Sequence, residues 1–438
     1  MQHSHEALDR PGGFSRVNLL TPLRHRDFRL LWTGMTVSLL GDGIFLVAMA
    51  WQAYELWNAP IALSLLGIGM TVPTIAFLLP AGILSDRIDR RSLMLWADTG
   101  RAIVIGVLAA LTLSGHLAFW HLVVLVAAYG VGTAFFTPAF EALVPDVVPA
   151  ADLPAANSLD QFIRPISLRL AGPALGGVLV AGVGAGAAFA FDAATFAVSV
   201  VAVFLMRPPA HPRSEHVDSS VGAVKEGLRF VRKRVWLWGT LVSAAIAYLA
   251  FMGPAEALLP YVVKNDLHAT ARDLGLVFAA GGIGAVGAAL LMGQRGHPRR
   301  DVTFMYATWT LATLAVAGYG LATASWQLMV ACLLFNALET AGTIVWATIK
   351  QRHVPASMLG RVSSLDWLIS IGLLPLSFAL AAPAAAAIGA QATLVAASLV
   401  GTVFTLGALF LPGMRDIEGG AAEPDAAEST SPLQRAAA

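Results

Sequence analysis

Long apolar stretches alternate with short polar breaks along almost the whole chain. A helix of about 20 apolar residues crosses the hydrocarbon core of a bilayer, and only helices or closed barrels satisfy every backbone polar group there. The pattern therefore predicts an all-α membrane protein with twelve transmembrane helices. Charge or proline interrupts the fifth and the eleventh. The expected spans cover residues of about 29–55, 60–84, 92–114, 119–143, 157–181, 186–206, 236–262, 272–293, 302–323, 326–349, 362–384 and 390–411.

The spans divide into two sets of six. The longest polar break, from Arg207 to Arg234, separates the sixth span from the seventh. Two short elements, Val148-Pro149-Ala150 and Ser158-Leu159-Asp160, return 206 positions later as Val354-Pro355-Ala356 and Ser364-Leu365-Asp366. We therefore expect two pseudo-symmetric six-helix bundles with a substrate site near the midplane between them. The predicted divisions are an N-terminal segment (1–28), a bundle (29–206), a cytoplasmic linker (207–235), a second bundle (236–411) and a disordered tail (412–438).

Composition supports the membrane interpretation and excludes several classes of function. Of the 438 residues, 57% are hydrophobic and only 13% are charged, about half the charged fraction of a soluble domain. The net charge of +1 gives no footprint for nucleic acid. Cys332 is the only cysteine, so neither an intramolecular disulfide nor a cysteine metal site is expected. The sequence shows no phosphate-binding loop, no paired metal-ligand spacing and no nucleophile elbow, which predicts neither an enzyme nor a cofactor.

The basic residues predict the orientation. With the N-terminus inside, the outside loops hold only Lys264 and Arg272, and Arg101, Arg164 and Arg169 fall within spans. All the other lysines and arginines then lie on the cytoplasmic side, as the positive-inside rule requires. The expected location is the plasma or inner membrane, with the lipid bilayer around the protein and both termini in the cytoplasm.

Three motifs carry a resemblance to the major facilitator superfamily. The run Gly82-x-x-x-Asp86-Arg87-x-x-Arg90-Arg91 after the second span resembles that family's loop motif A. Gly172-Pro173-Ala174-Leu175-Gly176-Gly177 in the fifth span is similar to the core of its antiporter motif. The opening run from Arg26-Asp27-Phe28 to Asp42 is similar to the branch of macrolide efflux proteins and the enterobactin exporter.

The resemblance implies a monomeric exporter that moves a small-molecule substrate outward while protons enter. Motif A would act as a cytoplasmic latch, with Asp86 accepting hydrogen bonds from Arg90 or from a helix N-terminus of the other half. The equivalent loop of the second half, Gly293–Arg300, keeps basic residues but lacks the aspartate, so the latch is expected to be asymmetric.

Two carboxylates at the centre of spans are the candidates for proton coupling. An ionisable group at mid-membrane costs about 2.5–3.5 kcal/mol and is a functional hypothesis by default. Asp42 lies in the middle of the first span and Glu339 in the middle of the tenth. Desolvation favours the protonated form of a buried carboxyl group, so either one is expected to exchange a proton. Arg169 of the fifth span is a candidate substrate or coupling partner, and a structural ion pair of Asp42 with Arg169 is the alternative.

Other charges within spans have alternative structural roles. Asp160 and Arg164 have the favourable spacing of a helical ion pair, and Arg164 is also a coupling candidate. Glu141 and Glu256 are also candidate substrate or coupling partners. Glu141 is expected to pair with motif A arginines or to lie at the surface, and Glu256 to face the outer vestibule. For Asp98 and Arg101 a role in packing and topology is expected. Asp192, near the outer end of the sixth span, is expected to be interfacial.

The function predicted from these observations is secondary export of small, apolar or amphipathic molecules by proton antiport with alternating access. A nutrient importer or symporter of the same fold is the first alternative, although the scarcity of midplane polar groups disfavours a sugar. A membrane sensor that transports nothing is the second. The sequence does not identify the substrate.

Overall fold

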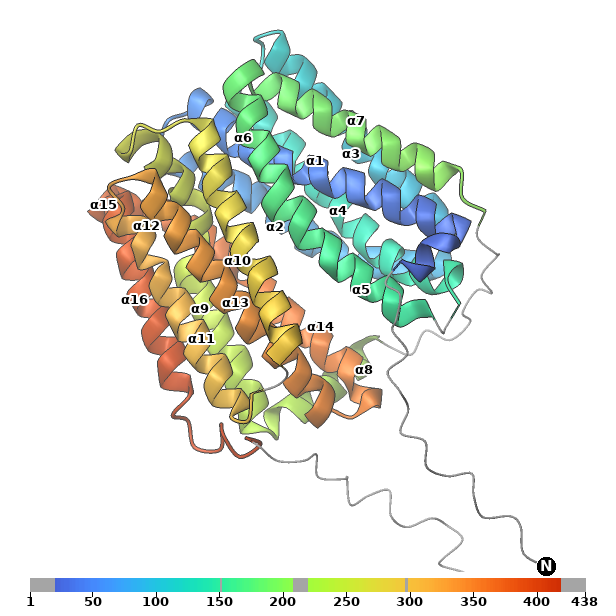
Figure 1. The fold of residues 1–438 in the computed structure, drawn as a ribbon, viewed down its shortest axis with the longest axis vertical. Helices are drawn as coiled ribbons and strands as arrows, with labels where there is room; N and C mark the ends of the chain where they lie inside the picture. Colours follow the sequence, from blue (N-terminus) through green and yellow to red (C-terminus); the bar gives the residue numbers. More distant parts are fainter. Residues whose placement is uncertain (1–19, 150–151, 208–219, 296–297, 419–438) are drawn as a thin grey trace, which may run out of the picture.

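The computed structural model is helical throughout the residues that it describes, which are 20–149, 152–207, 220–295 and 298–418. These helices form two bundles that lie side by side (Figure 1). The first half contains η1 (Thr21–Arg24), α1 (Arg26–Leu56), α2 (Ile61–Arg87), α3 (Arg90–Leu113), α4 (Phe119–Val147), α5 (Leu153–Arg164), η3 (Pro165–Ala171), α6 (Gly172–Val183) and α7 (Ala185–Phe204).

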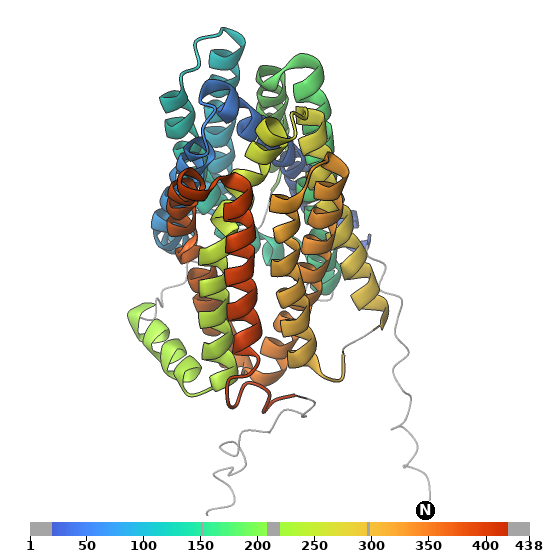
Figure 2. The same ribbon diagram turned by 90° about the vertical axis from the view of Figure 1, so that its left-hand side faces the viewer.

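The second half repeats this arrangement after a short amphipathic helix. It contains α8 (Ser220–Arg232), α9 (Val235–Tyr261), η4 (Val262–Asp266), α10 (Ala271–Arg295), α11 (Asp301–Ala315), α12 (Ala317–Leu321), α13 (Ser325–His353), α14 (Ala356–Gly372), α15 (Leu374–Ile388) and α16 (Ala390–Ala408). Figure 2 shows α9 and α16 running alongside each other, with α8 set apart near one end of the bundle.

Within the described ranges, eleven helical segments are long and apolar enough to cross a membrane. Each corresponds to one of the twelve predicted spans. The ninth predicted span, 302–323, is instead divided at Val316 into α11 and the five-residue α12. Gly318 and Gly320 follow this break, and glycine is a poor helix former.

The fifth and eleventh predicted spans are interrupted, as their sequences indicate. The fifth consists of α5, the π-helical segment η3 and α6, and η3 begins at Pro165. The eleventh consists of α14 and α15, which are separated at Leu373, and Pro375 stands in the first turn of α15. Proline lacks a backbone N–H and fits the first turn of a helix better than its interior.

Two segments are more structured than the sequence predicts. The interval 207–235, expected to be a linker, contains α8, whose Val231 is 4% exposed. Residues 412–418 of the predicted tail form turns, and Met414 is fully buried against Thr240 of α9. In both segments, apolar side chains pack onto a bundle. Their burial offsets the conformational entropy that the segment loses when it becomes ordered.

The two bundles meet at one end, which we call the closed end. Tyr54 Oη of α1 donates a hydrogen bond to the carbonyl oxygen of Ala257 in α9 at 2.5 Å. Asn58 Nδ2 donates to Asn265 Oδ1 at 2.6 Å, also between the bundles. Helix α6 also packs against α10, and α2 packs against α15, so that two further helix pairs join the bundles.

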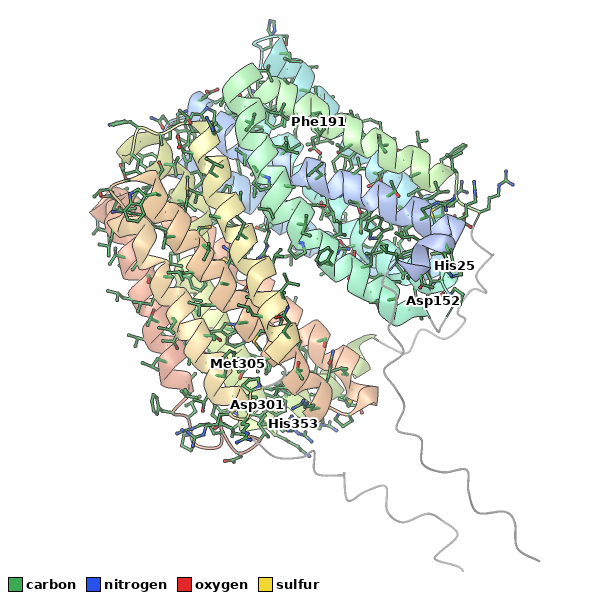
Figure 3. All side chains as sticks on the ribbon, viewed as in Figure 1. His25, Asp152, Phe191, Asp301, Met305 and His353 are labelled. Atoms are coloured by element: carbon green, nitrogen blue, oxygen red, sulfur yellow. The ribbon has the colours of Figure 1, made fainter. Side chains whose placement is uncertain are left out.

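The bundles spread apart toward the opposite end, which we call the open end (Figure 1). His25 and Asp152, at the open end of the first bundle, form a contact of 2.8 Å that joins the start of α1 to the start of α5. Figure 3 shows this pair well separated from His353, at the open end of the second bundle. The molecule is therefore closed at one end and divided at the other.

Candidate functional site

A cavity of about 380 Å³ lies within the second bundle. Helices α9, α11, α13, α14, α15 and α16 contribute its walls. Its apolar surface is rich in aromatic rings, which come from Tyr248, Phe251, Trp309, Phe335 and Trp346. Ligand cavities of this kind combine an apolar wall with a few polar groups that orient the ligand. The sequence predicted a site between the halves, whereas the side chains that line this cavity come from the second half.

Glu339 is the carboxylate on the α13 wall of the cavity. Thr343, one helical turn further along, donates a hydrogen bond to Glu339 Oε1 at 3.0 Å. Lys350 and Asp366 form an ion pair at another part of the cavity wall. Trp346 Nε1 also donates to Asp366 at 2.9 Å. The cavity thus holds one carboxylate bound to a hydroxyl group and one that a cation already neutralises.

Asp42 lies in the first bundle and does not pair with Arg169. Tyr129 Oη of α4 donates a hydrogen bond to Asp42 Oδ1 at 2.5 Å. The alternative of an Asp42–Arg169 ion pair is therefore wrong for this conformation. Arg101 also interacts electrostatically with Asp42, but its guanidinium group bonds directly to Asp98.

Arg169 connects the two bundles. It lies in η3, and its guanidinium group donates to Asn336 Oδ1 of α13 at 3.3 Å. The carbonyl oxygen of Arg169 approaches Gly282 of α10 so closely that a Cβ at position 282 would stand 2.5 Å from it. Glu256 of α9 is exposed and interacts electrostatically with Arg169. Arg169 thus contacts the second bundle through both its side chain and its backbone.

The predicted helical ion pair in α5 is present. Arg164 Nε donates to Asp160 Oδ2 at 2.8 Å, and the guanidinium group lies over the ring of Phe140. Glu141 is exposed, and its carboxylate interacts electrostatically with Arg164. Neither Arg164 nor Glu141 lines the cavity in the second bundle.

The loop motif is described only in part. The side chains of Gly82, Asp86 and Arg87 lie outside the described residues, so the predicted acceptor role of Asp86 stays a prediction. Arg90 Nη1 donates to Asp146 Oδ2 at 2.8 Å. Arg91 donates to the carbonyl oxygens of Val203 and Phe204, at the end of α7. Carbonyl groups at a helix C-terminus lack partners within the helix, and Arg91 satisfies two of them.

The Gly-Pro motif allows three helices to approach closely. A Cβ at Gly172 would stand 2.7 Å from Gly43 Cα of α1, and one at Gly176 would stand 2.9 Å from Ile44 Cα. A Cβ at Gly177 would stand 2.8 Å from the carbonyl oxygen of Ala271 in α10. Pro173 is buried beside them, at the start of α6. Small residues at such positions let membrane helices pack backbone to backbone.

Sequence reasoning missed several partners of the candidate residues. Tyr129, Asp146, Asn336 and Thr343 each contact a residue that the sequence singled out. Asp146 lies two residues before the repeated Val148-Pro149-Ala150 element, which is a positional signal. Tyr129 and Asn336 give no such signal, because hydropathy reports the depth of a residue but not the helix face on which it lies.

Comparison with known families places these features in context. The family model described as transmembrane secretion effector matches residues 17–429. Macrolide efflux protein A of Streptococcus pyogenes is 24% identical over 394 residues, which cover 89% of this chain and 96% of that protein. Multidrug efflux pump Tap of Mycolicibacterium fortuitum is 26% identical over 405 residues, with the same two coverages. Enterobactin exporter EntS of Citrobacter koseri is 27% identical over 363 residues, or 80% of this chain and 83% of EntS.

Solved structures of transporters share the fold. A bacterial homologue of the iron transporter ferroportin, in an inward-facing state, superposes with a TM-score of 0.65 at 16% identity. The alignment covers 89% of this chain and 99% of that structure. A bacterial homologue of the lysosomal transporter Spinster, inward-facing and unoccupied, gives a TM-score of 0.62 at 16% identity, with coverages of 90% and 98%.

Proposed function

Because this chain belongs to the major facilitator superfamily of membrane-embedded transporters, and its relatives include efflux pumps, we propose that it exports small, apolar or amphipathic molecules by proton antiport. The relatives transport, by their names, a macrolide, several drugs and enterobactin. Their diversity supports the class of reaction, export, more strongly than it supports a particular substrate.

One observation carries the proton-coupling part of the proposal. Asp42 and Glu339 lie within membrane helices, and each accepts a hydrogen bond from a hydroxyl group, of Tyr129 and Thr343 respectively. Neither forms a salt bridge with a described residue. A carboxylate held by a hydroxyl group can gain a proton without breaking an ion pair, whereas one that is paired with a cation cannot. These two groups are therefore suited to exchange protons.

The cavity in the second bundle supports the substrate part of the proposal. Its aromatic wall offers stacking and apolar contact to an amphipathic molecule, and Glu339 lies on that wall. Substrate would enter from the open end and bind there. Protonation of Glu339 or Asp42 from the opposite side would accompany the return of the empty carrier.

The proposed orientation follows from the charge asymmetry of the loops. The open end carries the basic segments and would face the cytoplasm, so this conformation would be inward-facing. The division of the ninth span at Val316 leaves room for twelve crossings, since α11 and α12 together cover residues 301–321. The latch around Asp86 would close the open end during the cycle, and the carrier would work as a monomer.

Flux through purified protein tests the proposal. Proteoliposomes with an imposed pH gradient should accumulate a macrolide, enterobactin or a lipophilic dye on the acidic side. Glu339→Gln should abolish the effect of the gradient while binding persists, because Gln keeps the shape but not the proton. The matched control is Glu418→Gln, at a carboxylate that caps the backbone N–H of Thr303 at 3.0 Å. If a bound substrate shows no gradient-dependent flux, the antiport proposal is wrong.

A further inference from the structure

Asp192 occupies a position that the sequence did not anticipate. It was expected to be interfacial, and the structure shows that it is fully buried between helices, with 0% of its surface exposed. Asp192 faces α1 from α7, and a Cβ at Gly41 would stand 2.3 Å from Asp192 Oδ1. Glycine at position 41 therefore makes room for the carboxyl group beside Asp42.

The carboxyl group of Asp192 is poorly satisfied. Thr195 Oγ1 lies 3.3 Å from Asp192 Oδ1 and donates more closely, at 2.7 Å, to the backbone carbonyl of Asp192. Asp192 Oδ2 is buried and has no hydrogen-bond partner among the described residues. Burial removes the hydration that an ionised carboxylate needs, and no described cation is bonded directly to Asp192 in its place.

The neighbouring charges do not balance either. The titratable groups that interact with Asp192 are Asp42 from α1, Arg101 from α3 and Tyr129 from α4. Asp98 of α3 pairs with Arg101. Helix α6 also packs on α7, and its sequence contains no titratable residue. Asp42, Asp98 and Asp192 thus all interact with the guanidinium group of Arg101, and Asp42 also interacts with Arg164 of α5, so the acidic groups still outnumber the basic ones.

The guanidinium group of Arg101 already has a carboxylate partner. It pairs with Asp98, which also accepts a hydrogen bond from Ser199 at 2.6 Å. The faces of Phe136 and Phe196 lie 4.4 and 4.5 Å from the guanidinium carbon. Arg101 Nε is buried and lacks a partner within the described part of the chain. The cluster therefore contains one unused donor on Arg101 and one unused acceptor on Asp192.

We propose that Asp192 is a further proton-binding carboxyl group, the second in the first bundle, which works with Asp42 across the contact between α1 and α7. In the conformation described, Asp192 holds the proton and is neutral. A movement of α7 against α3 that brings Arg101 Nε to Asp192 Oδ2 releases the proton, because the guanidinium group then neutralises the carboxylate. The proton binds from water and returns to water, so no other reactant is needed. The role of this proton in transport rests on the proposed antiport, but its binding does not.

Infrared titration of the purified protein tests the binding directly, without substrate or gradient. A protonated carboxyl group shielded from water has its own carbonyl stretching band. We expect Asp192→Asn to remove a band that the unmodified chain shows at neutral pH, and to lower measured proton uptake by roughly one per molecule. Asp273→Asn is the matched control, because Asp273 caps Thr270 N at 2.9 Å at the start of α10 and should leave the band unchanged. If Asp192→Asn leaves the carbonyl bands of the protonated carboxyl groups unchanged from those of the unmodified chain, the proposal is overturned.

A second variant protects the test against a folding defect. Thr195→Val removes the hydroxyl group beside Asp192 Oδ1 and keeps the shape of the side chain. It should shift the pH midpoint of the band, and an unshifted midpoint contradicts the assignment to Asp192. If the band behaves as expected but a pH gradient drives no flux, the proton site stands and the antiport proposal fails. If flux is gradient-driven and the band is insensitive to both variants, antiport stands and the Asp192 site fails.

Discussion

The contact between Gly177 and α10 predicts that one added methyl group will force the closed end apart. A Cβ at Gly177 would stand 2.8 Å from the carbonyl oxygen of Ala271 and 2.9 Å from Gly275 Cα. Ordinary van der Waals contact begins at 3.4 Å. Both obstructing atoms belong to the backbone of the other bundle, so no side chain can move aside. In Gly177→Ala the bundles must separate by at least about half an ångström, by this geometry.

Overpacking of this kind costs about 1–3 kcal/mol. In the proposed alternating-access cycle the cost applies only to conformations in which α6 touches α10, since the methyl group is free when the closed end opens. The ratio of closed to opened molecules should therefore fall by about 5- to 150-fold, the range that corresponds to 1–3 kcal/mol. Gly177→Ala should thus enrich the conformation opposite to the one described here.

Paired spin labels would measure this change. One label at His116 and one at Thr323 would report the separation of the bundles at the closed end, because both positions are exposed in loops. Cys332 must first be replaced by Ser, and it is the only native thiol. In Gly177→Ala we expect a second population of molecules in which the distance between the two labels is longer.

Gly182→Ala is the matched control, because it lies in the same helix with nothing within 4 Å of its Cβ. Both substitutions gain the same helix propensity of about 1 kcal/mol, so their difference isolates the clash. Identical distance distributions in the two variants would refute the reasoning.

Three further substitutions test contacts of the structure. Tyr54→Phe removes the hydrogen bond to α9 and should weaken the closed end by about 1 kcal/mol, which the same spin-label pair would detect. Arg101→Met leaves Asp98 buried without its cation and should lower stability by about 3–5 kcal/mol, seen as a lower midpoint of thermal unfolding; an unchanged midpoint would contradict the buried pair. Asp146→Asn removes the charge that holds Arg90 and should cost about 1.5–3 kcal/mol, and equal losses from either single and the double substitution would indicate that the two residues act as one unit.

The positions of the helices were largely accessible from the sequence. Membrane helices must satisfy their backbone internally, so an apolar run has few alternatives to a helix, and the predicted spans match the helices closely. The break at Val316 was not foreseen, because Gly318 and Gly320 are common in membrane helices and do not by themselves end one.

The candidate site was accessible only in part. The sequence identified Asp42 and Glu339, because a charge within an apolar run stands out. It placed Asp192 at the interface, because that judgement used distance from the end of the span alone. Burial of Asp192 depends on the glycine opposite it, Gly41, and on the rotation of α7. Such information is a property of pairs of helices, which one sequence does not encode as a pattern.

The π-helical segment η3 sets the rotation of the helix that follows it. Gly172 N donates to the carbonyl oxygen of Ser167, five residues earlier, so η3 contains more residues per turn than an α-helix. If the same residues adopted regular α geometry, the following helix would turn by about 100°. Gly172, Gly176 and Gly177 would then no longer face α1 and α10. The wide turn, rather than the identity of any one residue in it, therefore keeps the glycine contacts between the bundles.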